Sequence, residues 1–428
     1  MTNNLLADRI YPGRKVSTLL VLGLFIVTLL GRFTLDRIGI EQYGNFDLRS
    51  GAVGGLLVVT ILWRLLPGPC HYRQQWSPPV QLSLILIGYL AVTVFWSPPG
   101  ARIVQSILDL VYLSLLVALA VTISAPDPSR ARRIMIILMF IAGVVYALAG
   151  LLIGQTDQQG RTSAFGGGPN VYVRVIALGI IASIALTVIY RRKLFLLAIP
   201  GLAVAGVLSG SRGGTLAALA TGVVIAFLRW RRLSWRPLVA PVVVVAAAII
   251  GCAYLLQPKV IGALQQRFIS DIFVHDQSSG RLELLNEGLS IALGHPVTGG
   301  GLDSFYAWFG HTEDLGYPHN LLVDVAATGG LIGLSLFIAV MVAIVRGGRP
   351  WWNMPADQIT LVAAALYVAV ASMFSGNFYD SRFVWIFIAL AMNNCAAPDA
   401  SKKDASLTTS APQVLNATNH DGVSGPSS

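Results

Sequence analysis

Twelve apolar runs separated by short polar breaks constrain the fold of this chain more than any single motif does. A bilayer core about 30 Å thick is crossed by about 20 apolar residues in a helix. We therefore predict an all-α, polytopic membrane protein with about 12 transmembrane helices. The runs lie near residues 16–30, 51–66, 80–96, 103–124, 134–154, 171–189, 194–208, 213–228, 238–256, 320–345, 357–373 and 382–396.

The composition excludes the main soluble classes. Only 12% of the 428 residues are charged and the mean hydropathy is +0.68, whereas soluble domains carry about 25% charged residues. Too little polar surface is left to cover a water-soluble globule, which excludes a soluble enzyme, a secreted disulfide scaffold and a disordered chain. Cys70, Cys252 and Cys395 are isolated in the sequence, so we predict neither a disulfide nor a cysteine metal site.

The net charge of +10 is divided unevenly between the two sides of the predicted topology. On the side that holds both termini, the connections carry 19 Lys and Arg against six Asp and Glu; on the opposite side they carry 10 against 12. Positively charged loops stay in the cytoplasm. We therefore predict that both termini are cytoplasmic, and the basic excess gives no indication of nucleic-acid binding.

The domain organisation follows from the same spans. Residues 1–396 form the predicted membrane domain, and residues 397–428, rich in Ser, Thr, Pro, Gly and Asn, are a predicted disordered cytoplasmic tail. A large external loop is expected at 257–319. Within it, 281–293 has helical periodicity after a possible N-cap at Ser278 or Ser279, and predicts an amphipathic helix lying on the membrane or over a cavity. Its apolar face would hold Leu282, Leu285, Leu289 and Ala292.

Polar motifs gather in the external connections, while the cytoplasmic connections are plain Arg-rich links. This asymmetry indicates a functional site at the external membrane face, although glycine and asparagine also serve in ordinary tight turns. The motifs are RTSAFGGGPN (161–170), SGSR (209–212), SSGRLELL (278–285), GHPVTGGGLDSF (294–305), YPHN (317–320) and SGNFYDSR (375–382).

Two arginines in these motifs are candidates for binding an anion. Arg212 stands at the membrane boundary where a span begins, and Arg281 begins the predicted loop helix. Backbone N–H groups at a helix N-terminus together with a guanidinium suit a phosphate group. The alternatives are that Arg212 only reaches the interface with its side chain and that Arg281 is an ordinary first-turn residue.

His319 is the candidate general base, because an imidazole titrates near neutral pH. Nearby arginines would lower its pKa and keep it neutral; the alternative is a structural histidine. Asp380 would orient His319 or hold an arginine, unless it simply pairs with Arg382. The spacing of His and carboxylate residues is not typical of zinc, so no metal site is predicted.

Three charged residues fall within predicted spans: Asp109, Arg174 and Asp324. Intramembrane charge marks a functional site by default. Asp324 lies one helical turn beyond Asn320, which favours a role beneath the same site.

The motifs together resemble the O-antigen ligase and polymerase family of bacterial membrane glycosyltransferases over residues 160–390. His319-Asn320, followed after nine residues by Gly330-Leu-Ile-Gly333, is similar to the His-Asn…Gly-x-x-Gly signature of that family. Arg281-x-x-x-Leu285 is similar to the arginine motif of the large periplasmic loop in the ligases. SGSRGG, GHPVTGGGLDSF and GGGPN fit the same pattern.

The resemblance implies a ligase-type glycosyltransferase in the bacterial inner membrane, with its active site facing the periplasm. It would move an O-antigen or similar glycan from undecaprenyl diphosphate to a sugar hydroxyl of lipid A-core, with inversion and without metal or other cofactor. His319 and Asp380 would be catalytic. Arg212, Arg281 and Arg161 would bind the diphosphate.

Three further residues would support that site: Asn170, Asn320 and Asp324. The expected partners are the lipid-linked donor, a lipid A-core or glycan acceptor, and membrane lipids. Two alternatives remain open. One is a polymerase of O-antigen or exopolysaccharide that uses a second lipid-linked glycan as acceptor. The other is a transporter or flippase of lipid-linked glycans, although polar groups crowded at one face are not typical of transporters.

Overall fold

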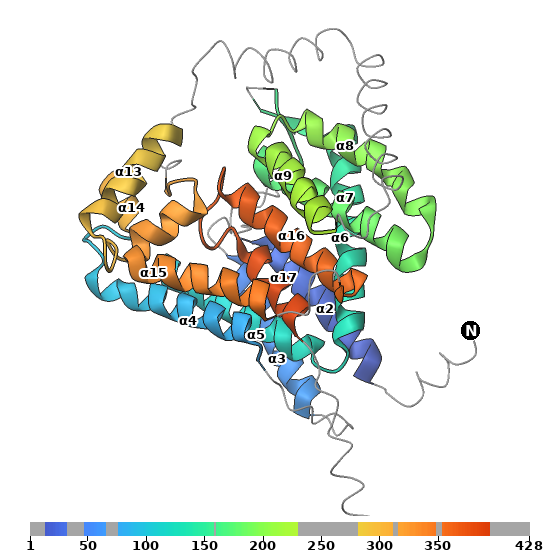
Figure 1. Cartoon of the computed structure of the whole chain (residues 1–428), viewed down its shortest axis with the longest axis horizontal. Coiled ribbons are helices and arrows are strands. Elements are labelled where there is room, and N and C mark those ends of the chain that lie inside the picture. Colours follow the sequence, from blue (N-terminus) through green and yellow to red (C-terminus); the bar gives the residue numbers. More distant parts are fainter. Residues whose placement is uncertain are drawn as a thin grey trace, which may run out of the picture.

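The computed structural model describes residues 13–31, 47–65, 76–157, 160–229, 281–310, 316–347 and 353–393. Within these ranges the chain is almost entirely helical (Figure 1). The first half contains α2 (Gly13–Leu30), α3 (Leu48–Leu65), α4 (Pro78–Val92), α5 (Ile103–Ser124), α6 (Pro128–Ile153) and α7 (Gly168–Tyr190). The second half contains α8 (Ile199–Leu208), α9 (Arg212–Arg229), α13 (Arg281–Gly294), α14 (Ser304–Phe309), α15 (Leu321–Arg346), α16 (Ala356–Ser372) and α17 (Arg382–Met392).

Short elements complete the described chain. The 3-10 turn η3 (Thr93–Trp96) extends α4, and η4 (Lys193–Ala198) leads into α8. Between α6 and α7, β1 (Gln155–Thr156) pairs antiparallel with β2 (Thr162–Ser163).

Eleven of the twelve predicted apolar runs coincide with described helices; the run at 238–256 lies outside the described residues. By length and composition, six helical segments of the described chain can cross a membrane: 48–65, 78–96, 103–124, 128–153, 168–190 and 321–346. Four shorter apolar segments lie at 16–30, 193–208, 356–372 and 382–392. The helical membrane character is thus confirmed, and the count of twelve spans stays a prediction.

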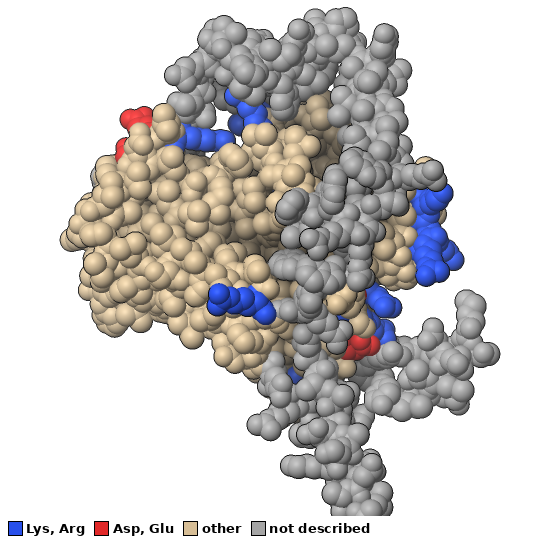
Figure 2. Space-filling view, viewed as in Figure 1, with Lys and Arg blue, Asp and Glu red and all other residues tan. Residues whose placement is uncertain are grey.

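The centre of the bundle is formed by α16 and α17. Every residue from Phe383 to Met392 is buried, and α17 packs against α4, α5, α6 and α16. The outer faces of the surrounding helices instead expose large apolar side chains, such as Leu65, Val104 and Leu152 at 74–78%. Figure 2 shows the same surface as broad areas without charge, with Lys and Arg confined to a few groups. Such a surface is suited to contact with lipid tails.

The helix predicted at 281–293 is confirmed as α13, but the predicted face is not the one that packs on the protein. α13 lies against α15 through Leu284, Gly288 and Ile291, which are buried. The predicted apolar stripe points elsewhere, and Leu282 and Leu289 are exposed. Gly288 decides the packing face, because a Cβ there would lie 2.7–2.8 Å from side-chain atoms of Val323 and Pro318.

α15 was expected as one continuous helix, but it is broken at Gly330, whose φ is 59° and ψ −154°. The segment 295–301 enters this break. Backbone N–H groups of Gly300 and Gly301 donate to carbonyls of Ala327 and Thr328, and those of Leu331 and Ile332 donate to Pro296 and Val297, all at 2.8–3.2 Å. The inserted segment therefore replaces the helical hydrogen bonds that the break removes, as is required where no water is at hand.

Replacing Gly330 by Ala is expected to destabilise the protein by about 2 kcal/mol or more, because that backbone conformation is essentially restricted to glycine. A Cβ would also lie 2.5 Å from the Gly299 nitrogen and the Val297 oxygen. Thermal unfolding in detergent measures the change. Gly88→Ala is the matched control, because a Cβ at that helical position meets nothing within 4 Å. Equal melting temperatures for the two variants would contradict this account of the break.

Candidate functional site

The candidate site lies where the starts of four helices, α7, α9, α13 and α15, come together. At the start of α7, Asn170 donates to the Ser375 hydroxyl at 3.0 Å and accepts from that of Ser211, just before α9, at 2.9 Å. Arg281, the first residue of α13, lines the same small space as Asn170 and Ser211. Because the positive ends of helix dipoles lie at their N-termini, this arrangement favours a negatively charged ligand.

The three arginines that were predicted to bind a diphosphate lie in this region. The pKa of the Arg281 guanidinium is lowered, first by burial and then by the positive charges of Arg161 and Arg212. Arg161 is held by Asp157, whose carboxylate accepts from its Nε at 2.7 Å across the turn between β1 and β2. Among the described residues no carboxylate forms an ion pair with Arg281. Arg281 therefore keeps a positive charge that an anion would stabilise.

His319 lies beside this cluster at the entrance to α15. Its backbone is left-handed, with φ 54°, which is uncommon for a residue other than glycine. Pro318 on one side is buried under α13. On the other side, the Asn320 side chain caps α15 by accepting from the amides of Leu322 and Val323. The neighbours thus hold the His319 backbone in a strained conformation, and this fixes the direction in which the imidazole leaves the chain. Strained backbone is common at functional sites.

The pKa of His319 is lowered, first by burial and then by the positive charge of Arg281, while the carboxylate of Asp380 acts in the opposite direction. The ring therefore stays neutral at pH 7. Its centroid is 4.3 Å from that of the Tyr317 ring, and its buried Nδ1 has no hydrogen-bond partner among the described residues. A neutral imidazole in this setting has the protonation state that a general base needs.

The segment 373–381 between α16 and α17 completes the site and is held from both sides. From α7, Arg174 donates to the Ser375 carbonyl. From the start of α15, Asn320 donates to the Met373 carbonyl at 3.1 Å and Asp324 accepts from the Phe378 amide at 2.9 Å. This bracing fixes the position of Asp380 near His319. The alternative considered from sequence, a pair between Asp380 and Arg382, is a weak contact, because the carboxylate and the guanidinium are 3.9 Å apart.

Two cavities border the segment 373–381. The wide cavity has a volume of about 810 Å³ and lies among α2, α6, α7 and the start of α17. Its walls are apolar toward α2 and α6, with Ile26, Leu30 and Val145 among them, and polar at one end, where Asn170 and Asp380 lie. A ligand with a long apolar part and a charged head fits this distribution.

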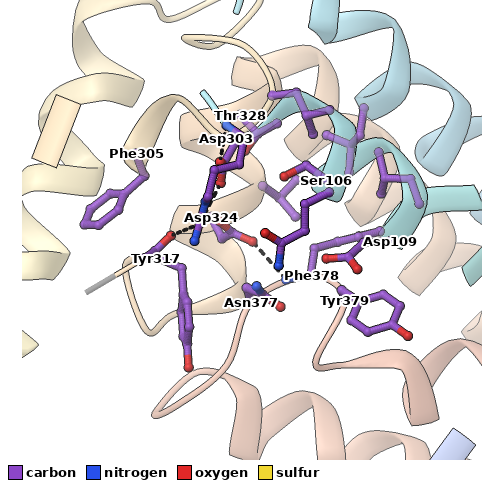
Figure 3. A pocket seen from close by; sticks show the side chains of 17 residues that line it. Ser106, Asp109, Asp303, Phe305, Tyr317, Asp324, Thr328, Asn377, Phe378 and Tyr379 are labelled. Carbon is purple, nitrogen blue, oxygen red and sulfur yellow. Dashed lines mark hydrogen bonds and ion pairs between the residues drawn. The ribbon is translucent and has the colours of Figure 1, made fainter. Parts of the chain in front are cut away.

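The second cavity, the polar pocket, has a volume of about 80 Å³ and lies on the other side of the same segment, between α5, α14 and α15. Figure 3 shows Asp109, Asp324 and Asn377 facing one another across it. Tyr317 lines both cavities. The site therefore has two compartments that meet beside His319.

Comparison with known proteins adds the family. Residues 194–338 match the family model described as O-Antigen ligase. Over these residues, about a third of the chain, the sequence is similar to that family. The resemblance seen in the sequence is confirmed over that segment, and it supports glycan transfer of the O-antigen ligase or polymerase kind. No curated protein and no solved structure was found to match the chain.

The segment that matches the family model contains one part of the candidate site. Arg212, Arg281, His319, Asn320 and Asp324 lie within the matched residues. Asn170, Arg161 and Asp380 lie outside them, and the structure brings all three to the same place through α7, the β1–β2 turn and the segment 373–381. The predicted site residues thus form one group in space, and their individual roles stay predictions.

Sequence reasoning missed several contributors. Arg174 was noted only as an intramembrane charge, yet it braces the segment 373–381 and lines the wide cavity. Tyr317 had no signal beyond its place in YPHN. Arg49, in a connection without any motif, is buried and forms an ion pair with Asp109 at 2.5 Å. The available clue to that pair was Asp109 itself, because a carboxylate inside a predicted span calls for a partner.

Two substitutions are expected to move the pKa of His319 in opposite directions. Arg281→Gln removes a positive charge and should raise it, whereas Asp380→Asn removes a negative charge and should lower it further. An NMR titration of protein labelled at the histidine Cε1 measures both, with the His319 signal assigned from its loss in His319→Gln. Identical midpoints in the two variants would show that neither charge acts on the ring.

Proposed function

We propose that this protein transfers an O-antigen or similar glycan from undecaprenyl diphosphate to a sugar hydroxyl of lipid A-core at the periplasmic face of the inner membrane. The observation that carries the proposal is that Arg161, Arg212, Arg281 and His319 cluster beside a large cavity with mainly apolar walls. Asn170 connects the two, because it lines that cavity and also the small space that holds Arg281. An anionic head on a long hydrocarbon chain matches this combination of charge and apolar surface.

The lining of the wide cavity supports a place for the donor. The polyprenyl chain would lie against the apolar side chains of α2 and α6, which face the bilayer interior on their other sides. The diphosphate would lie at the starts of α7, α9 and α13, where Arg281 shares a space with Asn170 and Ser211. Backbone N–H groups and guanidinium groups there would stabilise the charge that builds up on the leaving diphosphate.

His319 would take the acceptor's proton. The acceptor oxygen attacks the anomeric carbon, the bond from that carbon to the diphosphate oxygen breaks, and the electron pair leaves with the diphosphate. The acceptor's proton passes to the imidazole, and the nearby Asp380 carboxylate stabilises the resulting imidazolium. A single displacement of this kind inverts the anomeric centre.

Reconstitution tests the function directly. Purified protein in liposomes receives an undecaprenyl-diphosphate glycan and lipid A-core without nucleotide or metal, and the products are separated by mass. A glycan joined to lipid A-core is the expected result. Lengthening of the lipid-linked donor alone would instead establish a polymerase. Movement of the donor across the membrane with no new glycosidic bond would establish a transporter.

Replacing His319 by Ala is expected to lower the transfer rate about 100-fold or more, because a positioned general base contributes roughly that much. His295→Ala is the matched control: His295 is exposed and stacks on Trp308 with ring centroids 5.5 Å apart. The wild-type rate should also fall as the pH drops through the lowered pKa of His319. An unchanged transfer rate in His319→Ala would show that His319 is not the general base.

Arg281→Lys and Arg212→Lys are each expected to raise the donor KM and lower kcat, because an ammonium cannot reproduce the two-pronged guanidinium contact with a diphosphate. Arg192→Lys, at an exposed position beyond the opposite end of α7, is the matched control. Initial rates over a range of donor concentrations measure both constants. Unaltered constants in the two test variants would leave only a structural role for these arginines.

A further inference from the structure

The polar pocket is separated from the wide cavity by a single stretch of chain. In the segment 373–381, Gly376 and Asp380 line the wide cavity, whereas Asn377, Phe378 and Tyr379 line the polar pocket. The side chain of Tyr317 lines both and touches the His319 ring. A ligand in the polar pocket is therefore adjacent to the proposed base but on the opposite side from the proposed donor.

The charges of the polar pocket are unsuited to a second anion. Its wall holds three carboxylates, those of Asp109, Asp303 and Asp324, against the one guanidinium of Arg102. Each is fixed by a partner: Asp109 by Arg49 at 2.5 Å, Asp303 by Arg102 at 3.0 Å, and Asp324 by the Phe378 amide at 2.9 Å. A phosphate group would meet negative charge here, so the pocket differs from the arginine cluster in the ligand that it favours.

A metal ion and an apolar ligand are also poor fits. Within the described residues, no group of three or more His, Cys, Asp and Glu side chains is arranged to hold a metal ion. An apolar ligand would remove water from the half-buried side chains of Asp303 and Asn377 in the pocket wall without replacing their hydrogen bonds, which is costly. The fitting ligand is neutral and rich in hydroxyl groups.

The remaining wall suits a sugar ring. Fixed carboxylates accept strong hydrogen bonds from hydroxyl groups, and Gln105, Ser106 and Asn377 can both donate and accept. The rings of Phe305 and Tyr317 add flat apolar surface for the C–H groups of a sugar face. The volume of about 80 Å³ holds on the order of five water molecules, about the space of one sugar ring.

We propose that the polar pocket is the acceptor subsite and binds one neutral, hydroxyl-bearing sugar of the acceptor, so that its reacting hydroxyl reaches His319 past Tyr317. This rests on the proposed function and adds to it. The segment 373–381 then separates donor from acceptor, and the two substrates approach the base from opposite sides. A single inverting displacement needs the acceptor oxygen to attack the anomeric carbon on the face opposite the leaving diphosphate, and entry of the two substrates from different sides allows this.

The test measures sugar binding separately from transfer. The probe is the core oligosaccharide released by mild acid from lipopolysaccharide that lacks O-antigen, added to the protein in nanodiscs and followed by saturation-transfer NMR. Ser106→Leu places an apolar side chain in the pocket wall and is expected to weaken binding about tenfold or more. Ser114→Leu, on the same helix but lining neither cavity, is the matched control. Gln105→Leu is a second variant in case Ser106→Leu fails to fold.

Transfer assays on the same proteins distinguish the two proposals. The subsite is supported if Ser106→Leu or Gln105→Leu raises the acceptor KM about tenfold while the donor KM stays unchanged. A third outcome is that the wild-type protein binds the oligosaccharide, the pocket variants do not bind it, and none of the proteins transfers glycan. In that case the sugar subsite is supported and the proposed transfer is wrong. Wild-type binding or acceptor KM in folded pocket variants, or no binding by the wild type, overturns the subsite.

Discussion

The candidate site depends on how the segment 373–381 satisfies its backbone. This segment is not helical, yet it joins α16 to α17, the two helices at the centre of the bundle, and buried peptide groups without partners are costly. Side chains from the starts of α7 and α15 supply the missing partners, with Asn320 and Asp324 on one side and Arg174 on the other. The same residues that satisfy the backbone therefore position Asp380 and separate the two cavities.

Charge is used differently at the two ends of the bundle. At the other end of α16 from the candidate site, Arg132 and Asp357 form a buried pair at 2.8 Å and Arg132 also donates to the Asn393 carbonyl, so this arginine serves packing. At the candidate site, the charges that shift the pKa of Arg281 come from Arg161, Arg212 and Tyr317, and in the described part of the chain no carboxylate is among them. An excess of like charge destabilises a fold unless a ligand offsets it, which is why the arginine cluster and not the total charge of the chain indicates function.

Much of the fold and the composition of the site could be predicted from sequence. Long apolar runs locate helices because a helix that crosses the bilayer core needs about 20 apolar residues. Polar motifs at the ends of these runs identify His319 and the arginines. Details set by contacts between distant residues could not be predicted. The packing face of α13 depends on Gly288 fitting against Pro318, and the partner of Asp109 is Arg49 in a connection with no motif. Periodicity describes one helix at a time and does not say which neighbour a face meets.

The break in α15 has a consequence for how the chain tolerates change in length. Loops on a protein surface usually accept insertions and deletions. The segment 295–301, however, contributes its carbonyls and amides to the hydrogen-bond ladder of α15 on both sides of Gly330. Adding or removing one residue would move these groups out of register with all four of their partners. In GHPVTGGGLDSF the number of residues is therefore as much a structural requirement as their identity.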